Sequence, residues 1–521
     1  MFNIIKRIDN NRKIYYYCDE VHSSHHPNIV DSKGVLENYK KGLLALDGNS
    51  HSKKLGLVGL IAVSMGTTIG SGVFTLAGDM AANGANTGAV IVGWLVCGVG
   101  MVGLILSIFG LNRSKPEIVG GISTYAQAGW GDFVGFSTTY GYWISVVLCN
   151  VSYATLLFGS IGHFIPAFGN GNNLLSIISA SIFFWLLCAL VCSGIRNASF
   201  VNVVVTIAKV IPIFVFMVSI ILLSKFKAEI FMENFWGNGT IPFIDQVRAT
   251  STVTVWAFIG IEASVALSEK AKKMRDVGKA VVTAFFGVLF LYILISILSM
   301  GVLSQEQLAA LPNPSMGGIM REIVGDWGAS LISLGVIISL IGAALGITIV
   351  SSHIPNTAAK QGTFLSVFAK ENQSGSPVNS ALISTGIVQI FLVITYFSAS
   401  TYQFFYGISA SMIMIPYFLS CLYYVVVVFK KDGDFSSLSQ GQMLVQKCIA
   451  VLGSIYGLWL IYSAGLSRLM MTTILFSISV FLYVKHQKDC KKDVFQHKYD
   501  YALMAVFVVG AIISIIKMLI K

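Results

Sequence analysis

The sequence predicts an all-α polytopic membrane protein, built from two inverted repeats of five transmembrane helices with further helices at the C-terminus. Three observations predict this class: the composition, the number of long apolar segments and a pair of matching glycine breaks. Of 521 residues, 55% are hydrophobic and only 11% are charged, far from the average of soluble domains. Helices are favoured over a barrel, because barrel strands alternate over about ten residues.

A helix needs about 20 apolar residues to cross a bilayer. Residues 1–50 are polar and are expected to be a disordered cytoplasmic tail. The core should cover 54–430, with repeats at 55–224 and 250–429, and 431–521 should hold the last helices. The predicted spans are 55–78, 88–111, 133–160, 174–192, 198–224, 250–268, 279–303, 327–352, 378–398, 401–429, 446–464, 468–484 and 500–520.

The basic residues predict the orientation. If the N-terminus is cytoplasmic, 27 of the 35 Lys and Arg residues fall in cytoplasmic segments, as the positive-inside rule requires. We therefore expect a multi-pass protein of the cytoplasmic (inner) membrane. The net charge of +11 follows from this asymmetry and does not indicate nucleic acid. The polar N-terminus shows no cleavable signal peptide.

The cysteines predict neither a disulfide framework nor a metal site. Six of the eight lie in or beside apolar spans. The tail cluster of Cys18, His22, His25 and His26 has the residue types of a metal site, but its spacing matches no ligand pattern, and a solvated tail is favoured. We expect no metal and no cofactor.

The first predicted span is interrupted at Gly70-Ser71-Gly72. Glycine tolerates irregular backbone, and unwound backbone survives in a membrane where it lines a cavity. The freed amides at Ser71 and Gly72 would then attract a carboxylate. Close helix packing through Gly66 and Gly70 is the structural alternative.

A second break is predicted at Gly260, five spans later, beside Glu262 in an otherwise apolar stretch. An ionisable residue at the centre of a span costs about 2.5–3.5 kcal/mol and is a functional candidate. We expect a proton-sensitive gate or an anchor for a cation, with a structural carboxyl as the alternative. Trp256 precedes the break, where an indole face attracts cations or simply packs. Matching breaks in successive repeats point to a transporter.

Two further polar residues lie within spans. Lys209 is the basic residue deep in the fifth span. Its ammonium would occupy the space that a sodium ion fills in related folds, and changes in its protonation would couple transport to protons. The alternative is that the side chain snorkels to an interface. Asn150 would bond a substrate amine or another helix. We find no phosphate-binding loop and no nucleophile elbow, so an enzyme is not expected.

The connections between spans are expected to contain short interfacial helices. One is predicted within 112–132, and we assign its counterpart in the second repeat to 351–376, as an amphipathic helix. The charged linker 269–276 joins the second broken span to the next one. A solvated positive face is its expected role.

Together these motifs resemble the amino acid-polyamine-organocation (APC) superfamily. Within it, the chain is most similar to the basic amino acid/polyamine antiporters, the arginine/ornithine exchangers in particular. The similarity spans about 54–430. The motifs that carry it are Gly70-Ser71-Gly72-Val73-Phe74, Pro116-Glu117 through Gly120-Gly121 and Tyr125, Thr206-Ile207-Ala208-Lys209, Trp256 through Glu262, Ala271-Lys272-Lys273 and Gly375-Ser376-Pro377-Val378.

The resemblance implies the LeuT-like five-plus-five fold and a substrate site at the two breaks. It places the substrate carboxylate on Ser71 and Gly72, and Ile69 and Gly70 also belong to the expected substrate site. Asn150 and Trp256 would line the pocket, and Ile259 would meet the amine through its backbone. Glu262 would gate with pH, and Lys209 matches the lysine that replaces a sodium site. One residue departs from the pattern, since Thr348 stands where related arginine exchangers carry a tryptophan.

These expectations predict an antiporter that exchanges a cationic amino acid such as arginine for a product such as ornithine. A proton-coupled amino acid symporter is the alternative within transport, and a transporter-like sensor is the alternative from another class. The expected partners are amino acid substrates and the lipid bilayer, with a homodimer as one option for assembly. No nucleic acid partner is expected.

Overall fold

The computed structural model describes residues 3–8, 14–19, 56–118, 121–194, 198–260, 274–398, 402–436 and 438–520. The chain divides into two compact units, Met1–Lys54 and Leu55–Lys521. In the first unit, strands β1 (Asn3–Ile8) and β2 (Ile14–Asp19) pair antiparallel, with Ile5 opposite Tyr17. These two segments thus form a hairpin where we expected disorder, because isoleucine and tyrosine favour strands; the rest of the tail lies outside the described residues.

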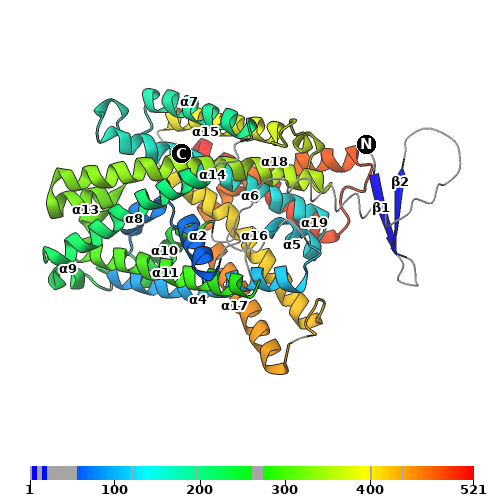
Figure 1. Ribbon diagram of the computed structural model, residues 1–521, viewed down its shortest axis with the longest axis horizontal. Coiled ribbons are helices and arrows are strands. Elements are labelled where there is room, and N and C mark those ends of the chain that lie inside the picture. The colour runs from blue at the N-terminus through cyan, green and yellow to red at the C-terminus, as the bar shows by residue number, and fades with distance from the viewer. Residues whose placement is uncertain are drawn as a thin grey trace. The chain divides into compact units, whose positions relative to one another are not determined.

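The second unit is helical in its described residues, and its helices follow the predicted spans (Figure 1). Ten of these helices are long and apolar enough to cross a membrane, so the chain is a multi-pass membrane protein. The first repeat contains α2 (Leu57–Thr68), η1 (Ser71–Phe74), α3 (Leu76–Ala82), α4 (Thr87–Ser114), α5 (Ile122–Trp130), α6 (Asp132–Gly162), η2 (Pro166–Phe168), α7 (Leu174–Cys192) and α8 (Ala198–Leu222).

After α9 (Ala228–Met232), the second repeat contains two short connecting helices besides its spans. Its elements are α10 (Phe243–Phe258), α11 (Met274–Met300), α12 (Gln305–Ala310), α13 (Ser315–Val324), α14 (Asp326–Lys360), η4 (Ser366–Ala369), α15 (Val378–Ser398) and α16 (Tyr402–Lys430). The C-terminal helices are α17 (Gln440–Ala464), α18 (Leu466–Asp489) and α19 (Lys498–Ile520).

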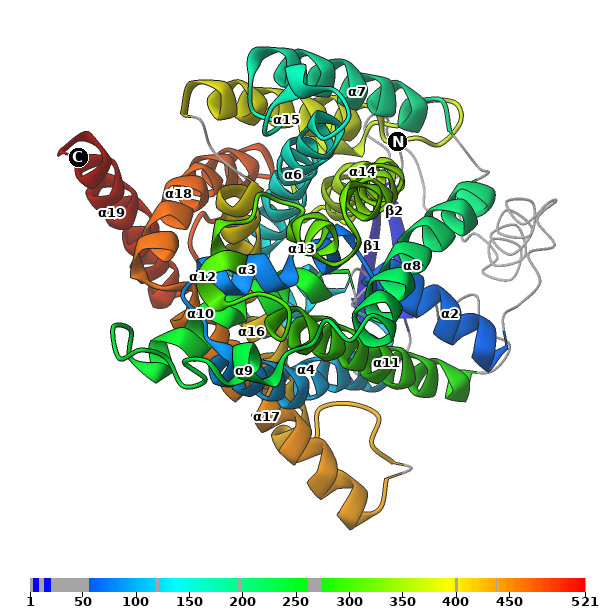
Figure 2. The same ribbon diagram turned by 90° about the vertical axis from the view of Figure 1, so that its left-hand side faces the viewer.

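Counterpart helices of the two repeats pack against each other. The second spans α4 and α11 are in contact, as are the third spans α6 and α14. The fourth spans α7 and α15 also lie side by side, at the top of both ribbon views (Figures 1 and 2). Two repeats related by a pseudo-two-fold axis place their equivalent helices against each other, so this arrangement supports the inverted repeat.

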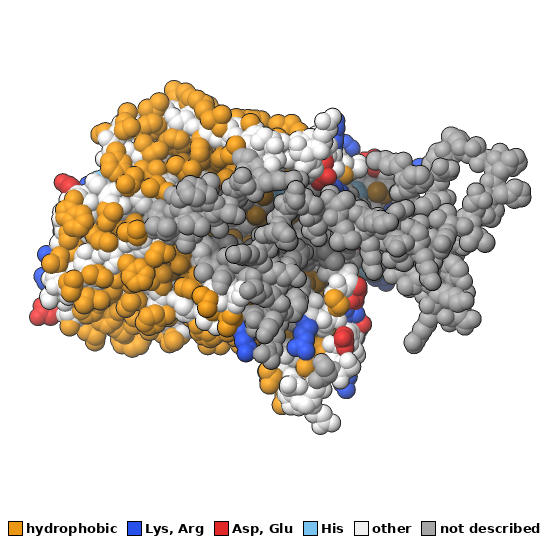
Figure 3. Space-filling model, in the orientation of Figure 1, with side chains coloured by type: hydrophobic (Ala, Val, Ile, Leu, Met, Phe, Trp, Pro, Cys, Tyr) orange, Lys and Arg blue, Asp and Glu red, His pale blue; other side chains and the backbone are white. Residues whose placement is uncertain are grey.

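The outer surface of the helices is strongly apolar. Phe290, Phe397 and Phe481 are 67%, 81% and 72% exposed, and hydrophobic side chains cover much of the face seen in Figure 3. An apolar surface this extensive is far larger than a soluble monomer exposes. It is the surface expected to face lipid.

One predicted connection is wrong. The short helix expected within 112–132 is α5, but no separate amphipathic helix occupies 351–376; instead α14 continues to Lys360 through Pro355. A proline frees the carbonyl four residues earlier. Here that carbonyl, Ser351 O, accepts a hydrogen bond of 3.0 Å from Ser384 Oγ, which itself accepts one of 2.8 Å from Trp143 Nε1. Because the Ser384 side chain of α15, itself held by Trp143 of α6, satisfies this carbonyl, α14 can continue past the proline.

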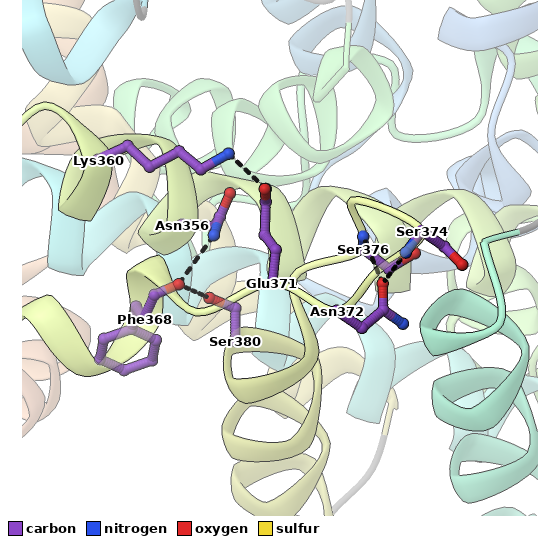
Figure 4. A network of polar contacts seen from close by, with 8 residues as sticks. All are labelled: Asn356, Lys360, Phe368, Glu371, Asn372, Ser374, Ser376 and Ser380. Atoms are coloured by element: carbon purple, nitrogen blue, oxygen red, sulfur yellow. Dashed lines mark hydrogen bonds and ion pairs between the residues drawn. The ribbon is translucent and has the colours of Figure 1, made fainter. Parts of the chain in front are cut away.

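The counterpart of α5 in chain order is α13, between the second and third spans of its repeat. After α14, a compact loop leads to α15 (Figure 4). The carbonyl of Phe368 accepts bonds from Asn356 Nδ2 (2.9 Å) and Ser380 Oγ (3.0 Å). Asn372 Oδ1 accepts the backbone N–H groups of Ser374 and Ser376. Side chains therefore replace helical hydrogen bonds in this loop.

The thirteenth span, α19, packs against α18 at the edge of the bundle (Figure 2). In α19, Phe507 stacks on Phe476 of α18 with ring centroids 5.0 Å apart. Tyr499 Oη donates to the carbonyl of Trp130, at the end of α5, over 2.8 Å. Asp500 Oδ2 accepts the N–H of His497 (2.9 Å) at the start of the helix, where a carboxylate stabilises the helix dipole.

Candidate functional site

The first span is broken where the glycines predict. Helix α2 ends at Thr68, and Ile69 (φ −70°, ψ 92°) and Gly70 (φ −89°, ψ −166°) are extended before η1 begins. Residues 71–74 are all buried. A β-carbon on Gly70 would meet only ordinary contacts, Tyr153 Oη at 3.8 Å and the Gly72 nitrogen at 4.0 Å. At Gly70, therefore, the alternative of close helix packing is not required.

The sixth span also ends inside the bundle. Helix α10 stops at Phe258, Ile259 is extended (φ −57°, ψ 130°), and Gly260 has a φ of +102°. Only glycine adopts this φ without strain, which explains the residue at this position. Glu262 and the linker 269–273 lie outside the described residues.

The two breaks lie against each other. A β-carbon on Gly72 would come within 3.1 Å of Trp256 Cδ1 and 3.2 Å of its Nε1. Tyr292 of α11 connects the helix ends, because its hydroxyl lies 3.2 Å from the carbonyl oxygen of Thr68 and 3.3 Å from that of Ala257. The last turns of α2 and α10 therefore share one hydrogen-bonding partner.

Trp256 is surrounded by tyrosines. Its Nε1 donates a 2.7 Å hydrogen bond to Tyr402 Oη, and its ring stacks on Tyr406 with centroids 5.4 Å apart and an interplanar angle of 29°. Tyr153 meets the indole edge to face at 5.9 Å. One indole face is thus occupied by Tyr406, and a bound cation would have to use the other face.

Asn150 and Thr348 are brought together from α6 and α14. Both side chains are buried, and Asn150 Nδ2 lies 3.4 Å from Thr348 Oγ1. Asn150 Oδ1 has no hydrogen-bond partner among the described residues. The pair therefore links two helices and still leaves an acceptor free for a ligand.

Lys209 lies in α8, and its side chain is only 6% exposed. This burial disagrees with the alternative that the lysine snorkels to an interface. Helix α8 packs against α14, α13 and α11 of the second repeat. The ammonium of Lys209 is therefore placed where it could interact with helices of the second repeat.

Five functional candidates were missed by sequence reasoning. Tyr292, Tyr402 and Tyr406 are common residues of apolar helices and carry no local signal. Tyr153 lies three residues after Asn150 in the same apolar helix and likewise carries no local signal. The fifth is Asp79, which is fully buried in α3 and was overlooked because the predicted span ended at residue 78. An acid one residue beyond a predicted span is a signal that would have found it.

The central residues are closed off from solvent in this structure. Ser71, Asn150, Trp256 and Thr348 are all at most 5% exposed. An open surface pocket of about 370 Å³ lies elsewhere, lined by Glu117, Ile118, Thr124, Gln127, Ala128 and Gln361. Among the described residues, no three His, Cys, Asp or Glu side chains gather into a metal site. The site offers amides, hydroxyls and aromatic faces, which suit a small zwitterion.

Comparison with known proteins gives the same family throughout. A family model for amino acid permeases matches residues 55–484. An arginine/ornithine antiporter of Pseudomonas aeruginosa is 39% identical over 473 residues, covering 89% of this chain and 97% of the relative. An arginine/agmatine antiporter of Chlamydia abortus is 36% identical, covering 84% and 91%. A putative arginine/ornithine antiporter of Escherichia coli K12 is 34% identical, covering 88% and 98%.

Three findings agree. The two helix breaks adjoin each other in paired five-span repeats, the family model matches most of the chain, and the relatives align with it almost end to end. The chain belongs to the amino acid permease family.

Proposed function

We propose that this protein is a secondary active amino acid transporter of the cytoplasmic membrane that exchanges arginine for ornithine by alternating access. The observation that carries the proposal is the contact between the two breaks, where Gly72 meets Trp256. Peptide groups outside regular helix and an aromatic face there match the two ends of a cationic amino acid. Relatives of nearly full length are named as antiporters of arginine with ornithine or agmatine.

The first break would hold the backbone end of the substrate. Extended residues Ile69 and Gly70 turn the chain so that the amides of Ser71 and Gly72 are available to a carboxylate. Hydrogen bonds from backbone amides to an anion are charge-assisted and strong. The backbone carbonyl of Ile259, at the extended end of α10, would accept from the substrate ammonium.

The side chain of the substrate would run toward Trp256. Guanidinium groups stack well on indole faces, and the face opposite Tyr406 is the one that would make this contact when the site opens. Asn150 and Thr348 would line the same pocket from α6 and α14. Because threonine is smaller than the tryptophan of related arginine exchangers, this pocket would also accept other side chains.

Glu262 would gate transport with pH, and Lys209 would take the place of a coupling sodium ion. Both roles rest on the family pattern, and the burial of Lys209 supports the second. An N-terminus on the cytoplasmic side would place α5 and the α14–α15 loop inside, and α12 and α13 outside. The distribution of Lys and Arg supports this orientation.

Exchange is tested with the full-length protein in liposomes. Uptake of radiolabelled arginine should be rapid with ornithine inside and slow with buffer inside. The matched control is glutamate inside, which should not accelerate uptake. Equal uptake in all three would refute exchange, and acceleration by an inward proton gradient without internal ornithine would favour symport instead.

A further inference from the structure

Asp79 is a buried carboxylate without a cationic partner. It lies in α3, its side chain is 0% exposed, and none of the ion pairs among the described residues includes it. Oδ1 accepts hydrogen bonds from the neutral amides of Gln403 (2.8 Å) and Asn313 (3.0 Å). Oδ2 has no hydrogen-bond partner in the described part of the chain, although the hydroxyl of Thr75 lies nearby.

Keeping Asp79 ionised in these surroundings costs free energy. Burying an ionised carboxylate is strongly unfavourable unless it is paired and hydrogen-bonded. Arg468 of α18, the guanidinium in this region, bonds to Thr252 Oγ1 (3.0 Å) and Asn83 Oδ1 (3.3 Å) and leaves the carboxylate alone. Asp79 is thus an acid to which the described residues supply no positive charge.

Asp79 is connected to the central site through α16. Its partner Gln403 directly follows Tyr402, whose hydroxyl accepts the hydrogen bond from Trp256 and lies 3.4 Å from Thr75 Oγ1. Asp79 itself lies about one turn beyond η1 on α3. Asn313 belongs to the segment between α12 and α13. The carboxylate therefore lies between the broken helix and the loop on the α12–α13 side of the protein.

We propose that Asp79 binds the positively charged side-chain group, guanidinium or ammonium, of the transported amino acid. This contact is additional to Trp256 and lies on the path between the breaks and the α12–α13 side. The inference rests on the proposed function, because it requires a cationic substrate. It accounts for the free Oδ2 atom and for the neutral donors on Oδ1, which hold the carboxylate in place without neutralising it.

The test compares arginine with citrulline, its neutral ureido isostere, by calorimetric titration of the purified full-length protein. Asp79→Asn preserves shape and removes the charge. The preference for arginine over citrulline should fall at least about tenfold, mainly through weaker arginine binding. An unchanged preference would overturn the proposal, as would an equal loss for both ligands.

Asp500 supplies the matched control, since it is also buried and also has one unpartnered oxygen. Asp500→Asn should leave the arginine preference unchanged. If Asp79→Asn does not fold, Gln403→Leu provides a second test: it removes one of the donors that hold the carboxylate in place and stabilise its charged form, so the preference for arginine should fall about threefold. No change would again contradict the proposal.

Two further outcomes are distinguishable. If the parent protein binds no arginine, the proposed function fails, whatever Asp79 does. If Asp79→Asn keeps the arginine preference but loses the pH dependence of exchange, the carboxylate binds a proton and the inference is wrong.

Discussion

The two broken spans both interrupt a membrane helix inside the bundle, but they do so with different residues. The first lies in a glycine-rich stretch: Ile69 and Gly70 are extended, and the short η1 segment, which contains Gly72, follows. The sixth ends in an aromatic run, with Trp256 and Phe258 in the last turn of α10. The first break thus contributes peptide groups and the sixth contributes a ring face. Tyr292 bonds to both helix ends, so neither break is independent of the other.

The contact between the breaks should be the most sensitive point. Gly72→Val places carbon atoms against the indole edge, which cannot yield because Trp256 is held by Tyr402 and Tyr406. Overpacking of this kind costs about 1–3 kcal/mol. We expect arginine exchange in liposomes to fall about tenfold to 100-fold.

Gly386 of α15 is the matched control, because a β-carbon there meets nothing within 4 Å. Gly386→Val should exchange arginine at close to the parent rate. If Gly72→Val does so too, the contact between the breaks does not control transport.

The contribution of the aromatic ring at the second break is tested at Trp256. Trp256→Leu removes the ring face and should weaken arginine binding by about 1–2 kcal/mol, which is about 5-fold to 30-fold in Kd. Calorimetric titration measures this directly. Unchanged affinity would remove Trp256 from the binding site.

The link between the breaks is tested at Tyr292. Tyr292→Phe leaves the carbonyls of Thr68 and Ala257 without this hydroxyl, which should cost about 1 kcal/mol of stability. A lower melting temperature, with slower exchange, is expected. Tyr140→Phe in α6 is the control, since Tyr140 is also buried and its hydroxyl makes no hydrogen bond to the described residues of either break. An equal effect would mean that the hydrogen bonds of Tyr292 to the two helix ends do not control stability or exchange.

The smallest effect at a fixed pH is expected at Glu262. Glutamine cannot titrate, so Glu262→Gln should flatten the pH profile of exchange. The ratio of rates at two pH values that differ in the parent should approach one in the variant. A parent-like profile would assign this carboxyl a structural role.

The sequence predicted the helical spans and both break positions because these depend on local properties. Helix length follows from the thickness of the bilayer, and Gly260 is needed by its own backbone, whose φ is +102°. The expected separate helix at 351–376 was wrong because α14 continues through Pro355 to Lys360. The hydroxyl that satisfies the freed carbonyl comes from Ser384, in the next helix.

What the sequence by itself determined was the set of membrane helices, the places where they break and the residue types exposed there, since burial in lipid dictates all three within a single segment. Only the tertiary structure decided the partners of those breaks. Tyr402 reaches Trp256 across 146 positions and Gln403 reaches Asp79 across 324. No local pattern encodes such pairs, because they arise only when helices that are far apart in the sequence pack together.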